Sequence, residues 1–235
     1  MAHQIAIVNR STVLSDDEVH RISAALQTQV SRDLTPLWGS ADRELRFIPS
    51  TESAPKGLWW VVVLDGSDQA GARGYHDITP DGLPIGKAFA ATDLMFGMQP
   101  SVTVSHELLE MIIDPSINLT AQSGPNFYAY EICDPCEDDV YSYGIDGVRV
   151  SDFVTPAWFR SYEKPGTRFD YAAYINSPLQ VLKGGFAQYL NPAAGTGWHL
   201  VLGDRVPQFK ARPPIGSRRE RRTHERYQWV ESTGE

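Results

Sequence analysis

The sequence predicts an α+β fold, and three observations support this class. Within the first 115 residues, strand-like and helix-like patterns follow one another. The run Trp59 to Leu64 is continuously apolar and rich in valine, which is typical of a central strand buried on both faces. From Phe159 onward, glycine, proline and aromatic residues dominate and helical periodicity is weak. We therefore expect a mixed sheet with a helix packed on it, followed by a loop-rich C-terminal region.

The other elements of the first half follow from local patterns. Further short strands are expected at residues 4–8, 44–48 and 85–90. Ser15 and Glu18 have the spacing of a capping box, which opens a helix that ends near Arg32. The stretch 66–84 is rich in Gly, Asp and Pro and predicts a long loop.

Later elements are marked by turn and breaker residues. A helix is expected from Ser101 to Asp114, because Pro115 disfavours helical geometry in the residue before it. Residues 127–132 alternate like a strand, and residues 141–150 resemble a hairpin that turns at Asp146-Gly147.

Two regions are expected along the 235 residues. Residues 1–158 form an α+β domain, and residues 159–235 form a Gly/Pro/aromatic-rich extension that packs on it. A basic polar tail begins at about residue 213 and contains Arg218-Arg219-Glu220-Arg221-Arg222. We expect this tail to be solvated; docking to an acidic partner or to nucleic acid is the alternative.

Composition excludes several function classes. The net charge of −8 gives no general electrostatic case for nucleic-acid binding. No run approaches the ~20 apolar residues that a membrane-spanning helix needs, and the N-terminus lacks the pattern of a secretory signal. We expect a cytoplasmic protein that does not enter a membrane, or a virion protein if a phage encodes it.

One short motif carries most of the chemical information. Residues 105–110 read Ser-His-Glu-Leu-Leu-Glu, which is H-E-x-x-E. On a helix, His106 and Glu110 project from one face and can hold one metal ion. Glu107 lies beside them, where a carboxylate can take a proton from water. The motif therefore predicts a metal site with an adjacent general base.

A catalytic zinc ion needs a third protein ligand. Glu131 and Asp134 are the candidates; Glu131 is preferred, and the other carboxylate could orient His106 through its ring N–H. Asp114 is expected to cap the following loop. Cys133 and Cys136 are expected to be buried thiols or a turn disulfide, with zinc ligation by Cys133 as the alternative.

The chain resembles a zincin-like group in these motifs. The H-E-x-x-E helix, the Asp114-Pro115 stop and the later Glu131-x-x-Asp134 segment are similar to largely uncharacterised bacterial and phage proteins, and plant Exordium-type proteins carry a similar pattern. The resemblance spans roughly residues 59 to 190. It implies a zincin-like fold in which an edge strand beside the helix binds an extended peptide, and a third ligand that is a carboxylate.

The function that this pattern implies is zinc-dependent peptide hydrolysis. Glu107 would act as the general base, and His76, Tyr141 or Tyr143 would donate to the oxyanion. We expect His76 to lie in a loop before the edge strand, where Asp77 could hold it instead. One histidine and two carboxylates make an anionic site, so Mn²⁺ or Ca²⁺ are alternatives to Zn²⁺.

Two other functions fit the same residues. The first is a catalytically inactive zincin-like scaffold, such as a structural or assembly component of a phage virion. Its aromatic residues would cover a neighbouring subunit rather than pack on their own domain; they include Tyr189, Trp198, Phe209 and Tyr227. The second is a metal-free binding module in which Glu110 pairs with a basic group. A catalytic protein should leave His106 and Glu107 at the floor of an open cleft, whereas a structural protein should bury them.

Overall fold

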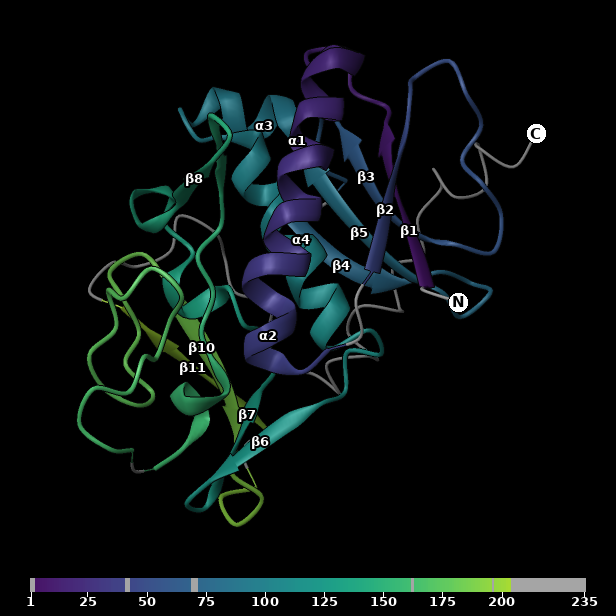
Figure 1. Cartoon of the computed structure of the whole chain (residues 1–235). Coiled ribbons are helices and arrows are strands. Elements are labelled where there is room, and N and C mark those ends of the chain that lie inside the picture. Colours follow the sequence, from purple (N-terminus) through teal and green to yellow (C-terminus); the bar gives the residue numbers. More distant parts are fainter. Residues whose placement is uncertain (1–2, 41–42, 69–71, 162, 196, 204–235) are drawn as a thin grey trace.

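A five-stranded mixed sheet organises the N-terminal part of the chain (Figure 1). The computed structural model describes residues 3–40, 43–68, 72–161, 163–195 and 197–203. The strands are β1 (His3–Asn9), β2 (Arg43–Ile48), β3 (Trp59–Leu64), β4 (Gly74–Ile78) and β5 (Pro84–Phe89), in the order β2-β1-β3-β5-β4. All neighbours are parallel except β4, which lies antiparallel to β5 at one edge. The predicted α+β class is confirmed, with β3 at the centre of the sheet.

The two helices expected from the sequence begin within one residue of their predicted starts. α1 (Asp16–Thr28) opens with the capping box between Ser15 and Glu18, in which both reciprocal hydrogen bonds form. A π-helix (Gln29–Leu34) and the short α2 (Thr35–Trp38) continue it, so the helical segment runs slightly beyond the predicted end. α3 (Ala90–Met95) precedes α4 (Pro100–Ile113), which carries the H-E-x-x-E motif within one residue of the predicted bounds.

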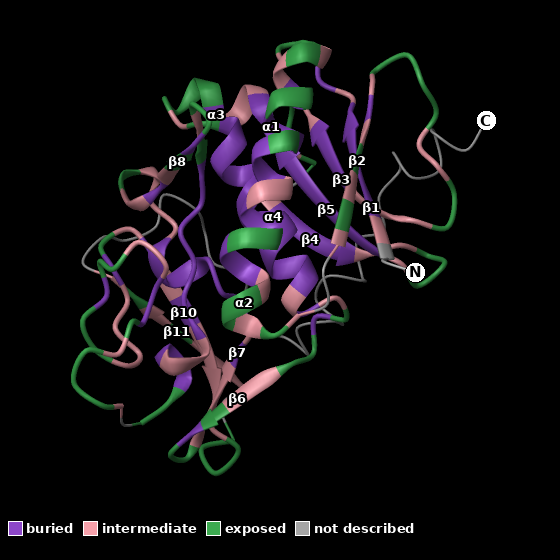
Figure 2. Cartoon of the chain, in the orientation of Figure 1, coloured by how far each residue is buried: buried purple, intermediate pink, exposed green. Residues whose placement is uncertain are grey.

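The two long helices cover the same face of the sheet. α1 lies against β1 and β2, and α4 lies against β4 and β5. Their apolar side chains form one core with residues such as Ile5, Val61 and Ala88. The alternate residues of the same strands, such as Ala6 and Val62, face the other side, where Ala54 and Leu58 pack on them. In Figure 2, β1, β3, β5 and α4 are largely buried, while β2 and the outer side of α1 are partly exposed.

The prediction of an unbroken loop over residues 66–84 is wrong, because β4 lies within it. The strand reads Gly-Tyr-His-Asp-Ile, and its three central residues are buried. Two of those three are polar, so no apolar alternation marks the strand in the sequence. His76 therefore lies on the edge strand itself rather than in a loop before it.

The second half of the chain contains short strands and many loops. A four-stranded antiparallel sheet has the order β11-β10-β7-β6; its strands are β6 (Thr120–Ser123), β7 (Asn126–Ala129), β10 (Phe186–Leu190) and β11 (Trp198–Leu202). The predicted hairpin is present as β8 (Tyr143–Ile145) and β9 (Val148–Val150), with Asp146 and Gly147 at positive φ in its turn. Because β10 pairs with β7, strands from both predicted regions share one sheet.

In the loops between β9 and β10, buried carboxylates accept backbone N–H groups that have no strand partner. Asp170, which is fully buried, accepts the backbone N–H groups of Tyr174 and Ile175. Asp152 accepts the N–H of Ala172 in the same way. Such bonds satisfy loop backbone that would otherwise be buried without a partner.

The aromatic residues named as candidates for covering a partner divide into two sets. Tyr189 packs against Tyr128 of the neighbouring strand and stacks on His199, and Trp198 begins β11. Phe209, Tyr227 and the basic cluster 218–222 lie outside the described residues. In the part of the chain that is described, no helix has the length and apolar character to span a bilayer.

Candidate metal centre

Six buried side chains from three segments meet beside α4. One comes from the edge strand β4, two come from the segment between β7 and β8, and three come from the motif helix α4. We call them the carboxylate–histidine cluster: His76, His106, Glu107, Glu110, Glu131 and Asp134. All of them are at least nine-tenths buried, so their charges must be balanced locally.

Strand pairing directs His76 toward the motif helix. His76 pairs with Gly86 of β5, and paired residues of neighbouring strands point to the same face of a sheet. A Cβ atom on Gly86 would lie 3.3 Å from the Cβ of Glu107, so this face is the one that α4 covers. At Gly74, a Cβ atom would lie 2.6 Å from Oε1 of Glu107. Glycine at both positions therefore leaves room for the Glu107 side chain between α4 and the edge strand.

Three of the six residues form what we call the outer group: His106, Glu110 and Asp134. Nε2 of His106 lies 3.3 Å from Oε2 of Glu110 and 3.3 Å from Oδ1 of Asp134. Asp134 begins a short 3-10 helix (Asp134–Cys136), which turns its carboxylate toward α4. These are the two motif residues predicted to bind metal, joined by one of the two predicted third ligands.

A second set, the inner group, shares Glu110: it comprises His76, Glu110 and Glu131. Nδ1 of His76 lies 3.5 Å from Oε2 of Glu110, and its Nε2 lies 3.6 Å from Oε2 of Glu131. Nδ1 also lies 3.7 Å from Oε2 of Glu107. His76 is thus in contact range of three carboxylates, a role that the sequence did not indicate.

The two separations at Nε2 of His106 match those between ligands of one metal ion, whereas the two at His76 involve different ring nitrogens, of which one ion can bind only one. Hydrogen bonds between nitrogen and oxygen cluster at about 2.7–3.2 Å, and the five distances here run from 3.3 to 3.7 Å. Two ligands bound at about 2.0–2.2 Å to a tetrahedral ion lie roughly 3.3–3.6 Å apart. The structure thus brings together histidine and carboxylate groups close enough to hold a metal ion, and the donor set fits one.

Crowded negative charge shifts the pKa values of the outer group. Burial lowers the pKa of His106, but the charge of Glu110 and the neighbouring Asp134 outweigh it and hold that pKa well above 6.5. Burial and the charge of Glu110 raise the pKa of Asp134 to about 8. Burial opposes ionisation of Glu110 as well, but His106, His76 and the N–H of Cys133 bring its pKa down to about 2. Glu110 is therefore the carboxylate of this group that stays ionised.

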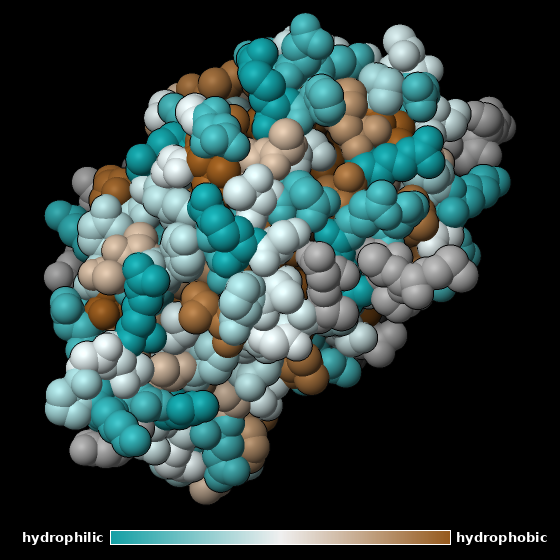
Figure 3. All heavy atoms as spheres, viewed as in Figure 1, coloured by the Kyte–Doolittle hydropathy of each residue, from teal (hydrophilic) through white to brown (hydrophobic). Residues whose placement is uncertain are grey.

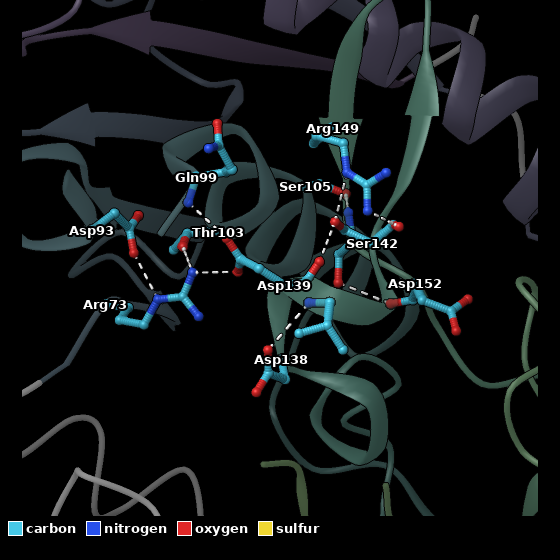
Figure 4. Close-up of polar contacts among 12 residues, drawn as sticks. Arg73, Asp93, Gln99, Thr103, Ser105, Asp138, Asp139, Ser142, Arg149 and Asp152 are labelled. Atoms are coloured by element: carbon cyan, nitrogen blue, oxygen red, sulfur yellow. Dashed lines mark hydrogen bonds and ion pairs between the residues drawn. The ribbon is translucent and has the colours of Figure 1, made fainter. Parts of the chain in front are cut away.

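A neighbouring ion-pair network fixes the segment that carries Asp134. Nε of Arg73 donates to Asp93 at 2.6 Å, and its Nη2 donates to Asp139 at 2.9 Å and to Thr103 of α4 at 3.1 Å (Figure 4). The other oxygen of Asp139 accepts the N–H of Gln99, at the start of α4. Residues 134–139 are therefore held against the first turns of the motif helix.

Exposure falls from the outer to the inner group. The His106 side chain is 11 % exposed and that of Asp134 is 6 % exposed, whereas His76 is 1 % and Glu131 is 2 % exposed. Solvent therefore reaches the cluster from the His106 side. His106 and Glu107 are both buried residues, which by the criterion stated above is the arrangement expected of a structural protein.

The remaining predicted residues have defined places. Asp114 caps the loop after α4, because its carboxylate accepts the N–H groups of Asn118 and Leu119. Cys133 and Cys136 are buried free thiols, and the N–H of Cys133 donates to Oε1 of Glu110 at 3.0 Å. The ring of Tyr141 packs edge-on against Tyr174.

The two tyrosines proposed as oxyanion donors differ in their contacts. The hydroxyl of Tyr143 donates to Asp33, a residue of the π-helix, at 2.9 Å. For Tyr141 the role of donor stays a prediction.

Comparisons with protein-family models, curated proteins and solved structures find no match for this chain.

Proposed function

We propose that this protein is a zinc-dependent hydrolase of peptides or proteins, with a zincin-like active site. The observation that carries the proposal is the position of Glu107, the residue after the metal-binding candidate His106. Its carboxylate lies against β4, within 3.7 Å of His76 and next to the ligand groups that share Glu110. The base and two of the three proposed ligands, His106 and Glu110, thus come from adjacent turns of α4, and Asp134 is the third ligand.

His106, Glu110 and Asp134 would hold the ion, and Glu107 would move the proton. A divalent ion supplies Lewis-acid polarisation of a carbonyl and lowers the pKa of water. Glu107 accepts the proton of the attacking water and returns it to the leaving amine. Ligands of one nitrogen and several oxygens also suit harder ions, so Mn²⁺ and Ca²⁺ are the alternatives to Zn²⁺.

The edge strand supports a peptide as the substrate. β4 is the last strand of the sheet and lies beside α4. An extended peptide could add to this edge through main-chain hydrogen bonds, which would place its backbone near the cluster. This arrangement is the one that the resemblance to zincin-like proteins implies.

Cleavage of a peptide library tests the proposal. Zinc-loaded protein should hydrolyse some library members, and Glu107→Gln should lower the rate by about 10²–10⁴-fold, because a general base contributes on that order. Glu107→Gln should still bind zinc, since Glu107 is not one of the three ligands. Glu52→Gln, at an exposed position, is the matched control. Stoichiometric zinc without any Glu107-dependent cleavage would rule out the hydrolase.

The alternative function is a metal-stabilised scaffold that assembles with other proteins, and two observations favour it. His106 and Glu107 are largely buried. Three consecutive apolar residues are exposed where α3 ends: Leu94, Met95 and Phe96. Figure 3 shows brown, hydrophobic spheres in the region of α3 on an otherwise mixed surface. Metal binding without cleavage, combined with loss of self-association or partner binding in Met95→Lys, would select this function.

A further inference from the structure

We propose that the carboxylate–histidine cluster holds two divalent metal ions, one in the outer group and one in the inner group, with Glu110 as the shared ligand. This inference rests on the metal binding in the proposed function and is independent of hydrolysis. The ion of the proposed hydrolase uses His106, Glu110 and Asp134, so His76 and Glu131 are an addition to that ligand set.

The Glu110 carboxylate lies between the outer and inner groups. Its Oε1 accepts the N–H of Cys133 at 3.0 Å, which fixes the orientation of the group. Its Oε2 then lies between the two histidines, 3.3 Å from Nε2 of His106 and 3.5 Å from Nδ1 of His76. A carboxylate oxygen has two lone pairs and can bind an ion on each side. Two-metal hydrolytic sites hold their ions about 3.5–4 Å apart, which a single bridging oxygen allows.

The cluster also concentrates acidic side chains in a buried site. The cluster contains four buried carboxylates, and the ion pairs described for them run to two histidines. Burying several acidic groups together is costly unless cations lie among them. An ion in each group would offset more of this cost than a single ion in the outer group. Arg73, at the residue before β4, is already paired with Asp93 and Asp139.

The two groups differ in burial, so the two ions would have different roles. The outer group keeps some exposure at His106, as a catalytic metal site with an open position requires. His76 and Glu131 are almost completely buried, as in a closed structural site. The inner ion would therefore tie the edge strand β4 to the segment before Asp134, and its charge would act on the oxyanion in place of His76.

Counting bound ions tests the proposal directly. The full chain is stripped with a chelator, reloaded with Zn²⁺, desalted and analysed by mass spectrometry of the metal. The wild type should retain about two ions per chain. His76→Ala and Glu131→Gln should each retain about one, and so should His106→Ala. His20→Ala, an exposed histidine on α1, is the matched control and should retain the wild-type count.

A second readout starts from the wild type, so its main result does not depend on the folding of a mutant. Loading the wild type with Mn²⁺ should give the electron paramagnetic resonance spectrum of an exchange-coupled pair, because two ions bridged by one oxygen interact magnetically. In His76→Ala that coupling should disappear while the spectrum of an isolated ion remains.

The outcomes separate this inference from the proposed hydrolase. A single ion in the wild type, lost in His106→Ala and kept in His76→Ala, would overturn the second site and leave the hydrolase with its metal. Two ions without any cleavage would support the second site and overturn the hydrolase. Absence of metal in the wild type would overturn both.

Discussion

Buried charges occur in two arrangements in this protein, and they differ in spacing. Lys87 and Arg73 approach their carboxylates closely, at 2.7 Å for Lys87–Asp68, 2.6 Å for Arg73–Asp93 and 2.9 Å for Arg73–Asp139. In the carboxylate–histidine cluster, the separations are 3.3 to 3.7 Å. Both arrangements lie beside β4 and β5.

The difference indicates what each arrangement is for. Direct contact with one or two carboxylates is how a structural cation offsets the desolvation of buried charge. A wider spacing, with more carboxylates than cationic groups, leaves room for an ion at the centre. The first arrangement should therefore govern stability, and the second should govern metal binding. The predictions below test this division.

The largest effect is expected at the shared ligand. Glu110→Gln should weaken zinc binding by at least about 1,000-fold, which corresponds to about 4 kcal/mol, because it removes the anionic ligand common to both groups. Titration calorimetry with Zn²⁺ on chelator-stripped protein measures this. Binding within about threefold of the wild type would contradict the assignment of Glu110, and Glu52→Gln shows the effect of the same substitution at an exposed site.

The next effect is expected at Arg73, and it concerns stability. Arg73→Met should lower the free energy of unfolding by about 3–5 kcal/mol, because it leaves the fully buried Asp93 without its ion pair. Urea denaturation followed by circular dichroism measures the change. Arg46→Met, on the exposed side of β2, should change the stability by less than about 0.5 kcal/mol. Equal changes in the free energy of unfolding for the two variants would show that the ion pairs of Arg73 do not stabilise the fold.

The smallest effect is expected at Lys87, and it depends on pH. Burial lowers the pKa of Lys87 to about 8, although Asp68 opposes this. Below pH 8 both the folded and unfolded states carry the proton, so folding includes the full cost of burying the charge. Between pH 8 and about 10.5 the folded state loses the proton first, and that cost is relieved.

Comparison with a neutral variant isolates the contribution of the Lys87 charge to stability. Relative to Lys87→Met, the wild type should gain about 1–3 kcal/mol of stability as the pH rises from 7 to 10.5. Urea denaturation at several pH values measures the difference. A constant difference across this range would mean that the pKa of Lys87 is not lowered in the folded protein.

Elements with apolar periodicity or a capping residue could be predicted from the sequence. α1, β3, α4 and the hairpin β8–β9 lie within a few residues of their expected bounds. β4 could not be predicted, because Gly74 and His76 face α4, where they make room for and contact that helix instead of forming an apolar stripe.

Part of the candidate site was also accessible from the sequence. His106, Glu107 and Glu110 are set by helical spacing alone. The partner of His106 is not, because Glu131 and Asp134 are three residues apart and only the 3-10 turn at Asp134 decides which carboxylate faces the outer group. The contribution of His76 depends on strand pairing with β5, which no local pattern reveals.

Anomalous diffraction at the zinc edge, on crystals grown with Zn²⁺, tests whether the cluster beside α4 is a metal centre. We expect an anomalous peak within bonding distance of Nε2 of His106 and Oε2 of Glu110. Crystals without such a peak, in which His106 forms direct hydrogen bonds to Glu110 and Asp134 instead, would contradict it.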